Sequence, residues 1–384
     1  MPVCRPADAA LAASWREHFL LPEGLYLDTA AHAPRLRAVQ DAAQHALDAR
    51  GAAWHVAWDE WVAQVERVRA LAAGLFDGDA DAVALVPSAG YALTLASRAL
   101  PLAAGDAVLL LADAFPSELL PWQHRCIETG ARLVAVTRGA DATAAVLDAL
   151  AREPAVRVVS LPQVHWHDGM LLDLDAIAPV VHARGAALVL DLSQSLGALA
   201  TAFDRWRPAF AVSVGYKWLF GPMGLSYLWA SPHWREHAAP LEHNWIATQA
   251  REDWTFSADA PAAWRAGARR FDAGGIADPQ RVAMAEAGLA QLQAWGLEAV
   301  SSHLGALTAA LKERVGDGFE TPAVHAPHLV GLRPRAARVE ACVQRLRAAS
   351  IVCTARHGWL RIAPHRHVDL ADMARVAGVL SGAG

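Results

Sequence analysis

The chain of 384 residues contains two lysines, and one of them, Lys217, lies in the apolar, glycine-flanked segment 212–224. Arginine supplies nearly all of the other positive charge, but arginine stays protonated and cannot act as an amine nucleophile. A lysine amine can do so once burial or a neighbouring cation lowers its pKa. A surface lysine at a strand end is the simpler explanation, yet the residues expected near Lys217 favour a chemical role.

A carboxylate and an amide are expected close to this lysine. Asp191 ends the apolar segment 187–191, and Gln194 follows three residues later. Ligands of parallel sheets bind at the carboxyl ends of strands, so a carboxylate there could keep a ring nitrogen protonated. An aspartate that caps the next helix is the alternative. Gln194 could face the same ligand.

Two further strand ends carry candidate ligand contacts. Ser88, Ala89 and Gly90 join a predicted strand to a predicted helix, and free amide groups at such a turn suit a phosphate. Phe115 follows the next strand and could stack on a flat ring, although core packing also explains a single phenylalanine. Each of these patterns is weak when taken alone.

Arg361 alternates with apolar neighbours in segment 358–363, which predicts a buried strand position. A guanidinium in such a place needs a carboxylate partner to offset its desolvation. The partner could be the carboxylate of an amino-acid substrate or a structural Asp or Glu of this chain.

Several other side chains are candidates without assigned roles: His32, His165, Trp166, His167 and Trp245. His165 and His167 would share one face of a strand and so invite a metal interpretation. No third ligand is obvious from the sequence, and imine chemistry has no use for a metal. We therefore predict core or pocket-lining histidines and no metal site.

Pyridoxal phosphate requires five features in its binding site: an amine, a carboxylate for the ring nitrogen, a group of amides that binds the phosphate, a flat wall for the ring and a cation for the substrate carboxylate. Each requirement has a candidate in this chain. The combination is more specific than any of its members.

The helices and strands expected around these residues predict an α/β fold. Short apolar segments alternate with helical stretches from residue 82 to residue 229, as in a mostly parallel sheet covered on both faces. After about residue 265 the pattern changes to two long helices, 279–295 and 297–315, and short strands. We predict a large domain at 25–265 and a smaller α+β domain made of 1–24 and 266–384.

Composition excludes several classes of protein. The net charge is −5 without a long basic run, which argues against nucleic-acid binding. The four cysteines contain no CxxC pair, which argues against a zinc site or a disulfide framework. The sequence shows neither a signal-peptide pattern nor an 18-residue apolar run, so we expect a soluble, cytoplasmic protein.

The ordered set of motifs resembles the fold type I enzymes that depend on pyridoxal 5'-phosphate, in particular the class V aminotransferase family. That family includes kynureninases, cysteine desulfurases and isopenicillin N epimerase-like proteins. The resemblance runs from Tyr26-Leu27-Asp28 to Leu360-Arg361-Ile362, and it is strongest at Asp191-Leu192-Ser193-Gln194 and at 216–224. It implies a large domain with a mostly parallel seven-stranded sheet and a smaller C-terminal domain.

The resemblance also implies roles for these residues. Lys217 would form the Schiff base with the cofactor, Asp191 would pair with the pyridine nitrogen, and Gln194 would contact the ring hydroxyl. Tyr216 would reach the phosphate, because Tyr216-Lys217 is similar to the Tyr-Lys pair of kynureninases. Phe115 would stack on the ring, and Arg361 would bind the substrate carboxylate. A homodimer is implied, since sites in this family draw on both subunits.

The resemblance leaves the reaction open. Cys353 lies in a β-rich stretch, whereas desulfurases carry their nucleophilic cysteine on a mobile loop, so persulfide chemistry is not favoured. We expect an enzyme that acts on an amino acid, by kynureninase-like C–C cleavage or by aminotransfer. Alternatives are a cysteine or selenocysteine lyase, an epimerase, or a non-catalytic binding protein of the same fold.

Overall fold

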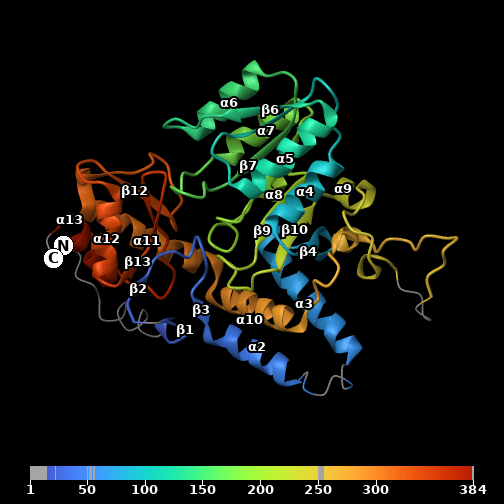
Figure 1. Ribbon diagram of the computed structural model, residues 1–384, viewed down its shortest axis with the longest axis horizontal. Helices are drawn as coiled ribbons and strands as arrows, with labels where there is room; N and C mark the ends of the chain where they lie inside the picture. Colours follow the sequence, from blue (N-terminus) through green and yellow to red (C-terminus); the bar gives the residue numbers. More distant parts are fainter. Residues whose placement is uncertain are drawn as a thin grey trace.

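The computed structural model describes residues 15–382 apart from 22, 50, 52–53, 55–56 and 250–254. A seven-stranded sheet forms the centre of the larger part (Figure 1). In spatial order its strands are β4 (Val83–Val86), β10 (Ser226–Ala230), β9 (Phe210–Val214), β8 (Ala187–Asp191), β7 (Val156–Pro162), β5 (Ala107–Leu111) and β6 (Arg132–Val136). Only β10 runs antiparallel to its neighbours. The predicted mostly parallel sheet is confirmed.

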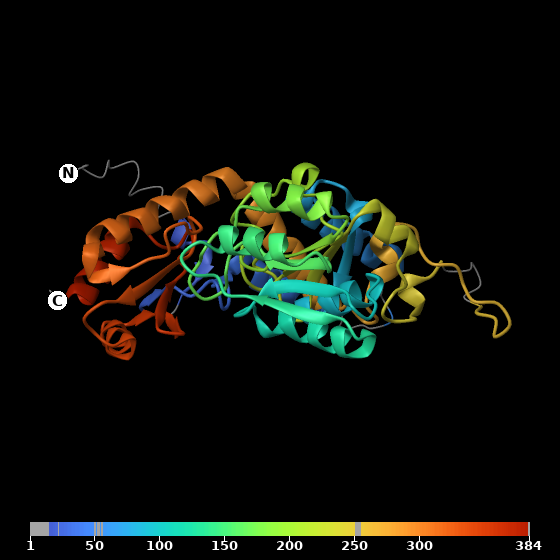
Figure 2. The ribbon, with the colours of Figure 1, turned by 90° about the horizontal axis from the view of Figure 1, so that it is seen from above.

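Helices follow the strands and cover both faces of this sheet, as the two views show (Figures 1 and 2). They are α4 (Ala89–Ala99), α5 (Pro116–Thr129), α6 (Ala142–Arg152), α7 (Leu174–Ala183), α8 (Phe203–Trp206) and α9 (Pro232–His237). Side chains cap the amino ends of α4, α6 and α7, from Ser88, Asp141 and Asp173 respectively. Strands β4, β5, β9 and β10 are buried along their whole length, which explains why their residues are apolar apart from Ser213 and Ser226.

Three long helices pack together beside the sheet: α2 (Arg37–Ala49), α3 (Trp58–Phe76) and α10 (Pro279–Trp295). A buried ion pair joins α3 to the sheet, since the Arg69 guanidinium donates to both carboxylate oxygens of Asp272, at 3.0 and 2.7 Å, and to the Val83 carbonyl at 2.7 Å. Asp272 also accepts from the Leu85 amide at 2.8 Å. Every strong polar group in this pair therefore has a partner.

The C-terminal part is a four-stranded antiparallel sheet in the order β11 (Phe319–Glu320), β12 (Val330–Pro334), β15 (Trp359–Ile362) and β14 (Thr354–Arg356). Its helices are α11 (Leu297–Val315), α12 (Val339–Ala348) and α13 (Leu370–Ser381). The predicted second α+β region is thus present. The exact domain boundaries at residues 24–25 and 265–266 remain a prediction, and residues 1–14 of the first segment lie outside the described residues.

The N-terminal segment bridges the two parts. Strand β1 (Phe19–Leu20) pairs with β3 (Arg35–Leu36), and β2 (Leu25–Tyr26) pairs in parallel with β13 (Ile351–Val352). Asp28 then forms an isolated bridge with Ala363 at the end of β15. This pairing carries the chain from the C-terminal sheet to the edge of the large sheet, and it sets Asp28 beside Arg361.

The remaining short elements are the 3-10 helices η2 (Ala80–Ala82), η3 (Trp245–Ala247), η4 (Gly267–Phe271) and η5 (Gly316–Gly318). The described part of segment 244–270 projects away from the C-terminal sheet, in gold in Figure 2. It has little regular structure, as its sequence predicts. No helix in the described part of the chain is long and apolar enough to cross a membrane.

Buried histidines predict how stability depends on pH. Burial lowers the pKa of His328 and of His367 to about 4, and it lowers that of His365 well below its ordinary value. Between pH 6.5 and 4 the unfolded chain binds more protons than the folded one, so stability is full above pH 6.5 and falls as the pH drops through this window. His328 and His367 should each cost on the order of 3 kcal/mol by pH 4.

Denaturant titrations from pH 8 to pH 4 measure this effect. We expect the midpoint to fall steeply below pH 6.5, and less steeply in His367→Gln. A midpoint that stayed constant over this range would contradict the burial of these rings as neutral groups.

Candidate active site

A cavity of about 160 Å³ lies at the carboxyl ends of the large sheet's strands. Residues that follow β4, β5, β7, β8 and β9 line it, because the ends of parallel strands meet at one edge of a sheet. Seven of the predicted site residues line this one cavity: Ser88, Ala89, Phe115, Asp191, Gln194, Tyr216 and Lys217. Gly90 lies one residue farther into α4, and Arg361 lies outside the cavity lining.

Lys217 is held by the tight loop that follows β9. The Gly221 amide donates to the Gly215 carbonyl at 2.8 Å, and a Cβ on Gly215 would lie 2.4 Å from the Leu225 carbonyl oxygen. This close approach explains the glycine at 215. Lys217 is 8% exposed, and its Nζ lies 5.5 Å from the Phe115 ring centroid. Burial lowers its pKa to about 8, against the opposing charge of Asp191, so the amine has a neutral fraction near physiological pH.

Asp191 occupies the last position of β8, where the strand carries it to the cavity. One carboxylate oxygen accepts from the Ser193 amide at 2.9 Å, which fixes the side chain. It lies near enough to Lys217 to raise the pKa of that amine. A fixed carboxylate and a buried amine in one cavity are the two charged groups that the sequence predicts there.

The amino end of α4 forms another wall of the cavity. Ser88 Oγ caps the helix by accepting from the Tyr91 amide at 3.1 Å. The amides of Ala89 and Gly90 are in the first turn, where a helix provides no backbone acceptors. An anion at this end would meet free N–H groups and the positive end of the helix dipole.

Aromatic rings close the cavity. Phe115 is 37% exposed and meets Trp166 edge to face, with centroids 5.4 Å apart. The Trp166 indole donates to the Asp113 carbonyl at 2.9 Å, which fixes its orientation. The Tyr216 ring lies 5.0 Å from that of His32. Phe115 is therefore placed to lie against a ring bound in the cavity.

Gln194 connects the cavity to the surrounding core. Its amide nitrogen donates to the Ala30 carbonyl at 3.0 Å, and its amide oxygen accepts from the Trp218 indole at 3.0 Å. One amide N–H remains for a ligand, which is compatible with the predicted contact to a ring hydroxyl.

Arg361 has the structural carboxylate partner that the sequence left open. Its Nε and Nη2 donate to one Asp28 oxygen, at 3.2 and 2.8 Å, and its Nη1 donates to the Trp166 carbonyl at 3.0 Å. Because Trp166 lines the cavity, this contact places Arg361 next to it, and the charge of Arg361 lowers the pKa of Lys217. Two of its five N–H groups have no partner in these contacts. Binding of a substrate carboxylate remains a prediction.

His165 and His167 belong to a buried charge network behind Trp166. Both rings lie close to Asp113, and the potential metal-ligand atoms of these three residues lie within 4.8 Å of one another. Asp113 is thus a possible third ligand that the sequence did not suggest. The Arg138 guanidinium, however, bonds to Asp113 at 2.8 Å and contacts His167 Nε2 at 3.2 Å. A bound cation would have to displace this arginine. The absence of a metal therefore remains a prediction, with Arg138 as its physical support.

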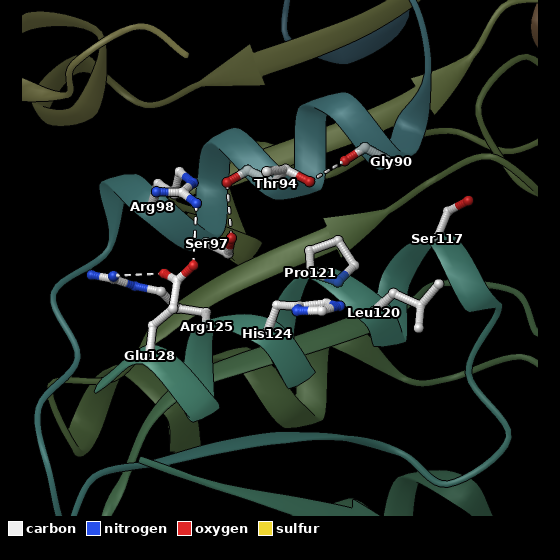
Figure 3. A pocket seen from close by; sticks show the side chains of 10 residues that line it. All are labelled: Gly90, Thr94, Ser97, Arg98, Ser117, Leu120, Pro121, His124, Arg125 and Glu128. Atoms are coloured by element: carbon white, nitrogen blue, oxygen red, sulfur yellow. Dashed lines mark hydrogen bonds and ion pairs between the residues drawn. The ribbon is translucent and has the colours of Figure 1, made fainter. Parts of the chain in front are cut away.

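Two larger cavities are also present, and the first adjoins the candidate site, since Gly90 lines it and Ser117 lines both. A cavity of about 440 Å³ runs between α4 and α5, and in it Arg98 and Arg125 both point to Glu128 (Figure 3). Another, of about 510 Å³, is lined by Trp58, Trp245 and neighbouring residues. Trp245 thus lies apart from His32, His165, Trp166 and His167, the other residues to which the sequence assigned no role.

The residues present fit pyridoxal phosphate. Lys217 Nζ makes no hydrogen bond to the residues that the structure describes, and it shares the cavity with a fixed carboxylate and a helix amino end. Glu118, a buried carboxyl in the same lining, is a further site residue that the sequence pattern alone does not reveal.

Comparisons with known proteins identify the family of the chain. The profile of the class-V aminotransferase family matches residues 25–344. An uncharacterized aminotransferase of Bacillus subtilis, YcbU, is 25% identical over 324 residues, which cover 82% of this chain and 83% of that protein. The kynureninase of Deinococcus radiodurans is 32% identical over 217 residues, which cover 56% and 50%.

Among solved structures, the cysteine desulfurase of Thermococcus onnurineus superimposes with a TM-score of 0.83 at 18% identity, covering 100% of this chain and 99% of that one. A likeness at this identity supports the fold type I architecture and leaves the reaction open. The chain belongs to the class-V aminotransferase family of pyridoxal-phosphate-dependent enzymes.

Proposed function

We propose that the protein acts on an amino acid through a covalent link between Lys217 and pyridoxal phosphate, by kynureninase-like C–C cleavage or by aminotransfer. The observation that carries this proposal is the buried Lys217 amine, which shares a small cavity with Asp191 and with the amino end of α4. When bound, the cofactor supplies an aldehyde that bonds to amines and a ring that accepts electron density.

Each side chain has a task in this proposal. Lys217 Nζ, once released by the incoming amino group, takes the proton from the substrate Cα and returns it. Its pKa of about 8 suits this exchange near neutral pH. Asp191 holds a proton at the ring nitrogen, and the amides of Ala89 and Gly90 bind the phosphate. Phe115 lies against the ring and excludes water.

The cysteines favour this reaction class over desulfuration. Burial and the charge of Asp28 raise the pKa of the Cys353 thiol to about 12, and burial raises that of Cys126. Thiolates are the reactive form of cysteine, so both thiols are poor nucleophiles. Cys342 is also buried. The cysteines in the described part of the chain therefore do not favour a persulfide-forming desulfurase, and a cysteine or selenocysteine lyase or an epimerase remains the alternative.

Arg361 is predicted to bind the substrate carboxylate. We expect Arg361→Ala to raise KM for the amino acid at least 10-fold with cofactor still bound, since a charge-assisted hydrogen bond contributes about 1.5–3 kcal/mol. The same change should lower stability, because Asp28 would remain buried without a cation.

The double variant Arg361→Ala with Asp28→Asn separates these effects. It should recover part of the stability and none of the substrate affinity. Arg333→Ala, an exposed arginine on neighbouring β12, is the control. An unchanged KM in Arg361→Ala would remove this residue from the substrate site.

We also propose a homodimer. The aromatic face that Trp58 and Trp245 build, 39% and 43% exposed, supports it, since aromatic side chains are enriched in subunit interfaces. Analytical ultracentrifugation should give twice the mass of one chain for the wild type. When Trp58 and Trp245 are both changed to Ser, it should give the mass of a single chain.

A substrate panel tests the reaction. Holoenzyme incubated with individual amino acids, including kynurenine and cysteine, is assayed for keto acid, alanine, anthranilate and sulfide. We expect anthranilate with alanine, or a keto acid. Release of sulfide from cysteine as the main activity would overturn the proposed reaction class while leaving the cofactor assignment intact.

A further inference from the structure

Glu118 is the one carboxyl that lines the cavity beside Asp191 in the described part of the chain. It lies in the first turn of α5, which begins directly after Phe115, and it is 1% exposed. Burying a charged carboxylate is costly unless a cation or several hydrogen bonds compensate it. An ion pair to Glu118 is absent among the described residues.

The surroundings of Glu118 favour its uncharged form. From β7, Ser160 Oγ donates to Glu118 Oε1 at 2.9 Å, and this is a single neutral hydrogen bond. The negative charge of Asp191, on β8, disfavours a second negative charge on Glu118 and raises its pKa. His165, in the segment after β7, lowers the pKa of Glu118. Burial first, and Asp191 second, raise the pKa of Glu118 to about 8.

We propose that Glu118 and Asp191 form a carboxyl pair with one negative charge between them, in which Glu118 keeps its proton and Asp191 faces the ring nitrogen of the cofactor. Glu118 is thus a positioning residue that acts through Asp191. This inference rests on the proposed cofactor site.

The pair sets the charge at one end of the cavity. With Glu118 neutral, a single negative charge stabilises the protonated ring nitrogen. Ionisation of Glu118 at alkaline pH adds a second one, which holds protons on the ring nitrogen and on Lys217 more firmly. The cofactor site should therefore change its properties as Glu118 titrates.

Infrared spectroscopy of the cofactor-free protein tests the proton directly. The wild-type protein at pH 6.5 should show the carbonyl band of a protonated carboxylic acid, and the band should disappear as the pH rises through about 8. Glu118→Gln should lack the band throughout. Glu128→Gln, an exposed glutamate on the same helix, should keep it. The proposal would be overturned if the wild type showed no such band, or if the Glu118→Gln variant kept the band of the wild type.

Two neighbouring variants test the coupling. Asp191→Asn removes the like charge and should move the midpoint of the band to lower pH. Ser160→Ala removes the hydrogen bond that favours the charged form and should move it to higher pH. An unchanged midpoint in Asp191→Asn would show that the two carboxyls do not act as a pair.

The holoenzyme reports whether the pair acts on the cofactor. The visible absorption of the wild type should show a transition near pH 8 that Glu118→Gln lacks, while the two spectra agree at pH 6.5. Identical spectra at every pH would contradict the role of Glu118. Failure to bind the cofactor at all would instead refute the proposed function, and the infrared result on the cofactor-free protein would still stand.

Discussion

Replacing Lys217 by alanine should abolish covalent attachment of the cofactor and lower turnover by about 10²–10⁴-fold or more, the range that a positioned proton-transfer group contributes. The fold should persist, because the change removes a buried amine that makes no hydrogen bond to the described residues. The visible absorption of the lysine-bound cofactor should disappear, while non-covalent binding through Ser88, Ala89 and Gly90 remains.

The chain offers a matched control for this experiment. Lys312 is its other lysine, and it lies on α11 with its Nζ 2.9 Å from His325 Nε2. Lys312→Ala should retain the absorption and the turnover. If Lys217→Ala kept both, the role assigned to Lys217 would be wrong.

Asp191→Asn should bind the cofactor and lose about 10²-fold or more of its turnover. Asparagine keeps the shape of the side chain but has no negative charge to hold a proton at the ring nitrogen, so the ring accepts less electron density. The charge of Asp191 also raises the pKa of Lys217. The pH at which the bound cofactor's absorption changes should therefore move downward in the variant.

Cofactor affinity, turnover and the absorption–pH profile measure this prediction. Asp175→Asn on α7 is the control, because Asp175 is exposed and pairs with Arg205 away from the cavity. Wild-type turnover in Asp191→Asn would contradict the role of this carboxylate.

The fold could be predicted from the sequence because the apolar segments are short and the helices between them have clear ends. Buried strands such as 83–86 and 107–111 have unbroken apolar sequences, and glycine at 130 ends a helix in a left-handed conformation. The site followed from the same pattern, since residues placed after consecutive strands meet at one sheet edge.

Contacts between distant segments could not be predicted in this way. The pairing of Arg361 with Asp28 joins residues 333 positions apart, and it depends on the bridge between Asp28 and Ala363. The approach of Asp113 to His165 and His167 arises from the tertiary fold. The apolar pattern of residues 8–20 predicts a short amphipathic helix, of which residues up to 14 lie outside the described residues. The prediction is wrong at Phe19–Leu20, which pairs as β1.

Glu118 was overlooked for a different reason. A glutamate in the first turn of a helix is ordinarily explained by the helix dipole. Only its burial against Ser160 and Asp191 distinguishes it from such a surface residue.

The most direct test of the central claim is the site of covalent attachment. Holoenzyme is treated with borohydride, which fixes the cofactor on its amine, and is then digested and analysed by mass spectrometry. We predict that the added pyridoxyl mass lies on the peptide that contains Lys217. Attachment at Lys312, or a reduced protein that carries no added mass, would contradict the account.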